Sequence, residues 1–126
     1  MSDVLQYGLG WRQDIERREE LHSTAMLFAP PKTFSAPEEI THDWIKVENQ
    51  GKMGSCSGHS MSTCQEVLNY IATGGSIVQL SRMFAYLAGQ KMDGLLGQDQ
   101  GATITGSVRG ACEMGNCLET TFPYPA

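Results

Sequence analysis

Glycine is distributed very unevenly along this 126-residue chain. Only Gly8 and Gly10 fall within the first fifty residues, and the other twelve glycines follow. Glycine ends helices and permits tight turns and close helix contacts. The later part of the chain is therefore predicted to hold short helices separated by turns. We divide the sequence into an N-terminal arm and linker, residues 1–48, and a packed unit, residues 49–126.

The arm and linker offer few side chains for a hydrophobic core. They carry nine acidic and five basic residues. Residues 14–22 predict a short charged helix with little apolar surface. An extended chain is favoured next by three prolines, Pro30, Pro31 and Pro37. Residues 43–47 then predict a short strand that leads into the packed unit.

The packed unit predicts three helices and a mainly α fold. The first begins after Ser55, a suitable N-cap, and runs for about 17 residues to Gly74. The second follows Ser81 and ends near Lys91, and the third covers residues 102–114. Side chains at helical spacing, most of them apolar, predict the inward faces. These are Cys56, Ser60, Cys64, Val67, Leu68 and Ile71 in the first helix, Phe84, Leu87 and Ala88 in the second, and Ile104, Val108 and Ala111 in the third.

Composition and charge exclude several classes of partner. A net charge of −5 argues against a general binder of nucleic acids or anionic membranes. No apolar run has the length of a membrane span, and the first residues do not resemble a signal peptide. Four cysteines are too few for a disulfide scaffold, so we expect a reduced, cytoplasmic setting. We therefore expect neither a nucleic acid nor a membrane as a partner.

Cofactor and metal sites are not predicted either. Cys112 and Cys117 are separated by four residues and, even with Cys64, lack the paired second half of a zinc site. The glycine-rich loop of residues 94–101 is not followed by the Gly-Lys-Ser/Thr of a phosphate-binding loop.

The residues around Cys56 predict nucleophilic chemistry. A cysteine in the first turn of a helix lies near unsatisfied N–H groups and the positive end of the helix dipole, and both favour the thiolate. Gln50, six residues earlier, can present an amide N–H to the same place. This amide and the backbone N–H of Cys56 would form a two-donor oxyanion hole. The alternative is a helix-starting cysteine that is merely packed.

The segment Met53–Ser57 resembles the sequence around the nucleophile of papain-like cysteine peptidases, since the Gly, Ser and Cys match. Further segments resemble the compact bacterial and phage-type branch of that family, in the same order, and they cover most of the chain. They are Gly10–Asp14, Asp43–Gly51, Leu80–Phe84, Asp93–Gly94, Gly101–Ile104, Gly115–Glu119 and Phe122–Pro125.

The resemblance implies that the chain is the helical, left-hand half of a papain-like α+β fold, preceded by an extended arm. It implies that Cys56 is the nucleophile and Gln50 the oxyanion-hole glutamine. Met53 replaces a cysteine that many secreted members use in a disulfide, which suits a reduced setting. Ser57 replaces an aromatic residue, so that part of the cleft wall is smaller.

The resemblance also implies a histidine base and an Asn or Asp that orients it, about 130–150 residues after the cysteine. This chain ends at Ala126, so the base is expected from sequence beyond that residue or from a partner chain. His59 lies on the helix of Cys56 and would point along it, so a structural role is favoured for it. His22 and His42, in the arm and linker, belong to no motif that would make them the base.

Two functions follow. The first is thiol-dependent hydrolysis of a peptide or amide bond, acting on a peptide or protein substrate. The second is an inactive papain-like module that serves as an assembly component, for example in a phage virion. Either function leaves one side of the helical half without its partner layer. We expect another domain or another chain to cover that face.

Overall fold

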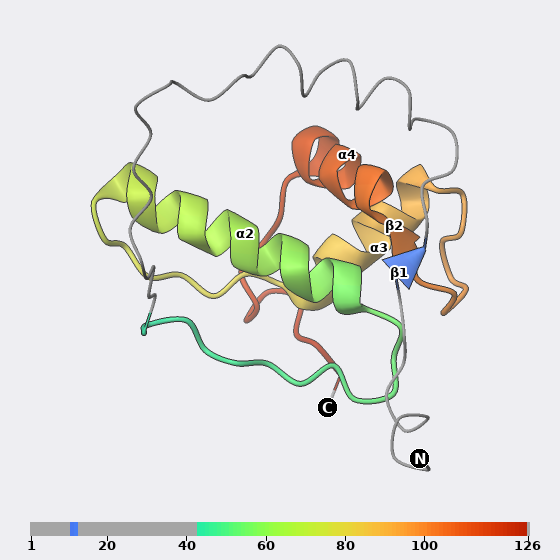
Figure 1. Ribbon diagram of the computed structural model, residues 1–126, viewed down its shortest axis with the longest axis horizontal. Helices are drawn as coiled ribbons and strands as arrows, with labels where there is room; N and C mark the ends of the chain where they lie inside the picture. Colours follow the sequence, from blue (N-terminus) through green and yellow to red (C-terminus); the bar gives the residue numbers. More distant parts are fainter. Residues whose placement is uncertain (1–10, 13–42, 126) are drawn as a thin grey trace, which may run out of the picture.

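The computed structural model describes residues 11–12 and 43–125. Its elements are β1 (Trp11–Arg12), α2 (Cys56–Thr73), α3 (Arg82–Met92), β2 (Ala102–Thr103) and α4 (Ile104–Met114). Three helices dominate, which confirms the prediction of a mainly helical fold (Figure 1). The predicted helix of residues 14–22, the three prolines and two of the histidines, His22 and His42, lie outside the described residues.

The helices begin and end close to the predicted residues because the capping chemistry is local. α2 ends at Gly74, whose φ of 70° is left-handed and costs little only for a residue without a Cβ. The hydroxyl of Ser81 accepts a hydrogen bond from the backbone N–H of Phe84 and caps α3. α4 begins two residues later than predicted, at Ile104, because Ala102 and Thr103 form β2 and Thr103 caps the helix.

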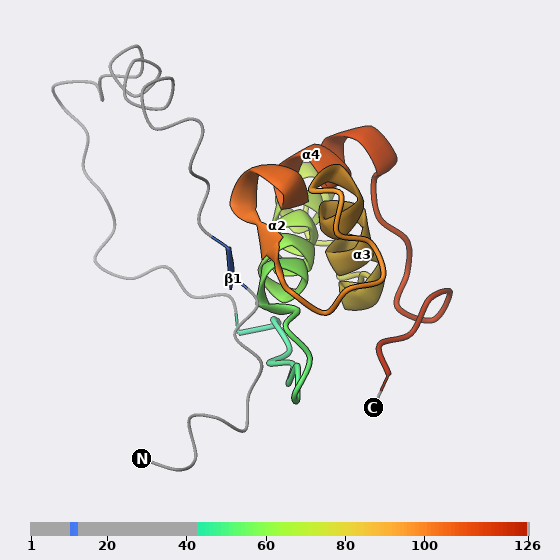
Figure 2. The same ribbon diagram turned by 90° about the vertical axis from the view of Figure 1, so that its right-hand side faces the viewer.

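The three helices pack closely through small residues. α3 contacts both α2 and α4 (Figure 2). A Cβ added to Gly58 of α2 would lie 2.6 Å from the Cβ of Tyr86 and 2.7 Å from the carbonyl oxygen of Arg82. A Cβ added to Gly110 of α4 would lie 2.8 Å from the carbonyl carbon of Ala88. Gly110 thus lets α4 approach the backbone of α3 closely.

The predicted inward faces of α2 and α4 were largely wrong. Leu68 and Ile71 are each 65% exposed, and Ile104 and Val108 are 59% and 44% exposed. Cys64, which we assigned to the core, is also exposed. The buried residues of these helices are instead small or polar, namely Ser57, Gly58, Ser62, Glu66, Gly106, Ser107 and Gly110. Close helix packing selects small side chains for the contact, which leaves the larger apolar ones facing outward.

Within α3 the prediction was better. Ala88 is buried and Phe84 and Leu87 are half-buried. The best-buried hydrophobic residues of the described chain are Ala85, Tyr86, Ala88 and Ala102. The core is therefore centred on α3.

An ion pair lies inside the contact between α2 and α3. Glu66 and Arg82 are 4% and 2% exposed, and the guanidinium meets the carboxylate in two hydrogen bonds of 2.5 and 3.1 Å. The same carboxylate accepts the backbone N–H of Leu80 at 2.7 Å, and Arg82 donates to the carbonyl of Leu80 at 2.6 Å. The pair thus also fixes the chain that leads into α3.

The start of α4 is fixed to the end of α3 by Asp93. Its carboxylate accepts the backbone N–H of Thr103 at 2.7 Å and the hydroxyl of Thr103 at 2.8 Å. β1 pairs in parallel with β2, with Trp11 opposite Ala102 and Arg12 opposite Thr103. The sequence did not predict this pairing, because two residues are too few to show a strand pattern.

The strand predicted for residues 43–47 is absent. These residues form a turn followed by irregular chain, and Val47 is 93% exposed. The segment is held by the ring of Trp44, which stacks on Tyr70 of α2 with centroids 4.5 Å apart. Stacking of two aromatic rings, and not hydrogen bonding to a neighbouring strand, therefore holds this segment. In the part of the chain that the structure describes, no helix combines the length and hydrophobicity needed to cross a bilayer.

Candidate active site

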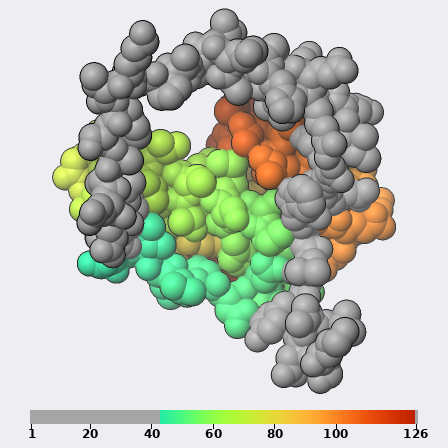
Figure 3. Space-filling view, viewed as in Figure 1, coloured from blue at the N-terminus to red at the C-terminus, as the bar shows by residue number. Residues whose placement is uncertain are grey.

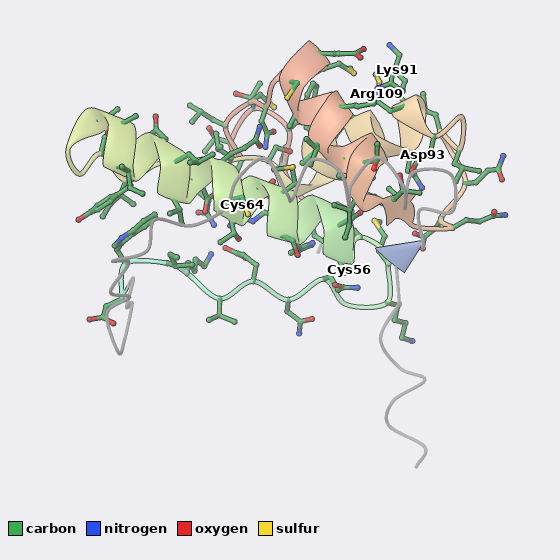
Figure 4. The ribbon with its side chains drawn as sticks, turned by 45° about the horizontal axis from the view of Figure 1, so that its top comes forward. Cys56, Cys64, Lys91, Asp93 and Arg109 are labelled. Atoms are coloured by element: carbon green, nitrogen blue, oxygen red, sulfur yellow. The ribbon has the colours of Figure 1, made fainter. Side chains whose placement is uncertain are left out.

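Cys56 is the first residue of α2 and is half-buried (Figure 4). The first turn of α2 contains no acidic side chain, so nothing in it offsets the positive end of the helix dipole. Ser55 occupies the predicted N-cap position, but its side chain makes no capping bond to the helix. The placement predicted for Cys56 at a helix N-terminus is therefore what the structure shows, and the predicted serine cap is not.

The turn that leads into Cys56, residues 49–55, is shaped by its own polar groups. Gly51 has a φ of 62°, which favours glycine, and its N–H donates to the side-chain oxygen of Asn49 at 2.8 Å. The side-chain amide of Gln50 donates to the carbonyl of Met53 at 3.0 Å. Gln50 is thus folded over its own turn, with its amide engaged within the segment that precedes Cys56.

An apolar groove of about 330 Å³ lies beside Cys56, between α2 and α4. The two helices lie side by side on the face seen in Figure 3. The groove is lined by Cys56, Ser57, Ser60, Met61, Cys64, Ile104, Ser107 and Val108. Several residues of the outward-facing stripes therefore form one concave surface next to the thiol. The hydroxyl of Ser57 is buried there and has no hydrogen-bond partner among the described residues.

A second set of contacts ties the turn to the loop before β2. The carboxylate of Asp99 accepts the backbone N–H of Gly54 at 2.9 Å and the hydroxyl of Tyr86 at 2.8 Å. That hydroxyl in turn accepts the N–H of Gly101 at 3.1 Å and the side-chain amide of Gln90 at 2.8 Å. Tyr86 thus links α3 directly to the loop before β2, and through Asp99 to the turn that leads into Cys56.

The buried tyrosine makes the fold sensitive to alkali. Burial, helped by the hydrogen bond to Asp99, raises the pKa of Tyr86 well above its ordinary value, and burial also raises the pKa of Tyr124. In the unfolded chain both phenols have a pKa of about 10. Their contribution to stability is therefore complete below that pH and is lost as the pH rises toward their folded values.

We predict that the free energy of unfolding falls as the pH rises above about pH 10. Tyr86→Phe should make this fall shallower, since the variant lacks the group that titrates differently in the two states. Urea unfolding at a series of pH values measures the slope. An equally steep slope in the variant would show that other groups cause the alkaline loss.

The ring of His59 contacts Ser55 and Tyr124. Its Nδ1 lies 3.0 Å from the carbonyl oxygen of Ser55, and its ring meets the edge of Tyr124 with centroids 4.8 Å apart. This agrees with the structural role favoured for it. All four cysteines are free thiols, and no group of three or more metal-ligating side chains occurs among residues 11–12 and 43–125.

Sequence reasoning missed three residues of this site. Asp99 was treated only as part of a loop, Tyr86 lies on a helix whose inward face was predicted from apolar residues, and Tyr124 entered only as part of a resemblance. The signal available for Asp99 was the surrounding glycines, since Gly97 and Gly101 both have positive φ and allow a loop to turn back. Nothing in the local pattern pointed from Tyr124 to a residue 69 positions earlier.

The sequence matches no protein-family profile and no curated protein. Among solved structures, it is similar to the crystal structure of xylellain, a cysteine protease from Xylella fastidiosa. The TM-score is 0.58 and the identity 22%, and the match covers 99% of this chain and 41% of the xylellain chain. The chain thus spans about two fifths of that protein's length. Its fold is the helical half of a papain-like fold.

Proposed function

We propose that this chain is the nucleophile-bearing half of a papain-like cysteine peptidase. The observation that carries the proposal is the position of Cys56, half-buried at an unneutralised helix N-terminus and beside an apolar groove, on a papain-like helical fold. The substrate would be a peptide or protein whose scissile carbonyl lies against the thiol.

The reaction would be acyl transfer. The Cys56 thiolate attacks the carbonyl carbon, and the backbone N–H of Cys56 and the side-chain amide of Gln50 stabilise the oxyanion. An N–H of the Gln50 amide donates to the carbonyl of Met53. The amide carries two N–H groups, and the contact with the oxyanion needs one of them. A histidine then protonates the leaving amine, and water hydrolyses the thioester.

That histidine, with its Asn or Asp, would come from a second half, supplied by further sequence or by another chain. We propose that the second half covers the face formed by α2 and α4. In support, four large apolar side chains of these helices, Leu68, Ile71, Ile104 and Val108, are between 44% and 65% exposed. A large exposed apolar patch often marks a surface that a partner covers.

One observation favours the alternative of an inactive module with a structural role. Within residues 43–125 the one histidine is His59, and its ring is engaged with Ser55 and Tyr124 rather than with the thiol. In this case Cys56 would be vestigial, and the apolar face would dock on a neighbour in an assembly.

Alkylation with iodoacetamide, resolved by residue through peptide mass spectrometry, separates the two functions. Cys64 is the internal control, because it is exposed on the same helix. An active-site Cys56 is expected to react faster than Cys64 near pH 7, although it is less exposed, because the N–H groups at the start of α2 stabilise negative charge on its sulfur during attack. A Cys56 slower than Cys64 at every pH would contradict the peptidase function and support the inactive module.

A further inference from the structure

We propose that Tyr124 is a positioning residue. It holds the turn of residues 49–55, which contains Gln50 and leads into Cys56, in the shape that the proposed reaction needs. This inference rests on the proposed role of Cys56 as nucleophile. Tyr124 lies near the end of the described chain and would help to set the geometry of the site. Tyr124 acts through its contacts with the turn and would touch neither substrate nor thiol.

The hydroxyl of Tyr124 contacts both ends of the turn. It donates to the carbonyl oxygen of Gln50 at 2.9 Å, and it lies 2.5 Å from the hydroxyl of Ser55. Because its single proton goes to Gln50, Tyr124 accepts the second hydrogen bond from Ser55. Ser55 is fully buried, at 0% exposure, so this hydroxyl has no access to water in place of Tyr124. One phenol therefore joins the candidate oxyanion residue to the residue that precedes the nucleophile.

Tyr124 is itself held firmly by the start of α3. The carboxylate of Glu119 accepts the backbone N–H of Tyr124 at 2.6 Å and the backbone N–H of Arg82 at 3.2 Å. The hydroxyl of Ser81 donates to the carbonyl of Phe122 at 2.6 Å. The segment that carries Tyr124 is thus fixed to a buried part of the fold. A side chain on a rigid support can position a turn, whereas one on a loose tail cannot.

The chemistry of the hydroxyl suits this role. Burial raises the pKa of Tyr124, so the phenol keeps its proton and remains a donor to Gln50 at neutral and mildly alkaline pH. Lys52 is an exposed titratable residue of this turn, and two further titratable side chains contact it or Tyr124. His59 meets the ring of Tyr124 edge-on, and Asp99 binds the N–H of Gly54.

The test is Tyr124→Phe in the full 126-residue chain. The variant keeps the ring and its contact with His59, and removes both hydrogen bonds. The rate of Cys56 alkylation by iodoacetamide is measured from about pH 6 to about pH 9.5. We expect a roughly two- to fivefold slower reaction at pH 7 and a rise in the pH of half-maximal rate, because a loosened turn weakens the effect of the helix terminus on the thiolate. Cys64 should be unaffected.

Tyr70→Phe is the matched control, because Tyr70 lies on α2 far from the turn and stacks on Trp44. It should leave the pH profile of Cys56 unchanged. A Tyr124→Phe chain that unfolds like the parent in urea, yet shows the parental Cys56 profile, would overturn the positioning role. If Tyr124→Phe does not fold, Ser55→Ala is the second test. It removes the hydrogen bond between Ser55 and Tyr124 and leaves Tyr124 itself unchanged. An unchanged Cys56 profile in Ser55→Ala would then overturn the proposal.

The two substitutions also form a cycle. If Tyr124 acts through Ser55, Tyr124→Phe should have a smaller effect in a Ser55→Ala background than in the parent. Full additivity would contradict the coupling. Failure of the proposed function looks different, since then Cys56 of the parent chain would already be slower than Cys64 at every pH.

Discussion

Glu66→Ala is expected to lower the free energy of unfolding by about 3–5 kcal/mol. The substitution leaves the guanidinium of Arg82, which is 2% exposed, without its anionic partner. It also removes the acceptor of the Leu80 N–H, which the carboxylate binds at 2.7 Å. A buried charge without a partner carries most of this cost, because desolvation of the ion is no longer offset by the carboxylate.

Urea unfolding followed by circular dichroism measures the effect of Glu66→Ala. Glu113→Ala is the control, since Glu113 forms an ion pair with Arg109 at 3.3 Å and both side chains are about half exposed. An exposed pair of this kind contributes at most about 0.5 kcal/mol. Similar losses in the two variants would show that the pair between α2 and α3 is not the strong contact that its burial indicates.

Gly58→Ala is expected to destabilise the chain by about 2 kcal/mol net. Alanine raises helix propensity by roughly 1 kcal/mol, but overpacking costs up to about 3 kcal/mol. The second term dominates here because the added Cβ would lie 2.7 Å from the carbonyl oxygen of Arg82 and 2.8 Å from the backbone nitrogen of Tyr86. Backbone atoms of a packed helix cannot move aside alone, so α2 and α3 must separate.

Ser60→Ala is the matched control for Gly58→Ala, because Ser60 is exposed two residues later on the same helix. Its effect on the free energy of unfolding should stay within about 0.5 kcal/mol. Thermal unfolding of the three proteins measures the difference. A Gly58→Ala chain as stable as the parent would show that α2 and α3 do not pack as closely as the structure indicates.

Local chemistry explains which predictions succeeded. The end of α2 at Gly74 and the cap of α3 at Ser81 depend on residues within one helical turn. The start of α2 at Cys56 was also predicted correctly, although Ser55 makes no side-chain cap and its hydroxyl contacts Tyr124 instead. Such signals can be read from the sequence without knowledge of the neighbours. The candidate nucleophile was found by the same reasoning, because its chemistry follows from its place at a helix start.

Tertiary packing explains which predictions failed. The periodicity of Leu68, Ile71, Ile104 and Val108 correctly indicated apolar faces, but a pattern does not say what covers a face. The helices pack instead through the faces that carry Gly58 and Gly110. Small side chains there let the helix backbones approach closely, and larger side chains would keep them apart. The strand predicted at residues 43–47 gave way to the stacking of Trp44 on Tyr70.

By itself, therefore, the sequence determined the mainly helical class, the limits of the helices and the placement of Cys56 at a helix N-terminus. Only the tertiary structure decided which faces are buried, and that Asp99 and Tyr124 meet the turn before Cys56 from 45 and 69 residues away. The reason is physical. Capping and turn formation depend on neighbours along the chain, whereas burial and long-range hydrogen bonds depend on which surfaces the whole fold brings together.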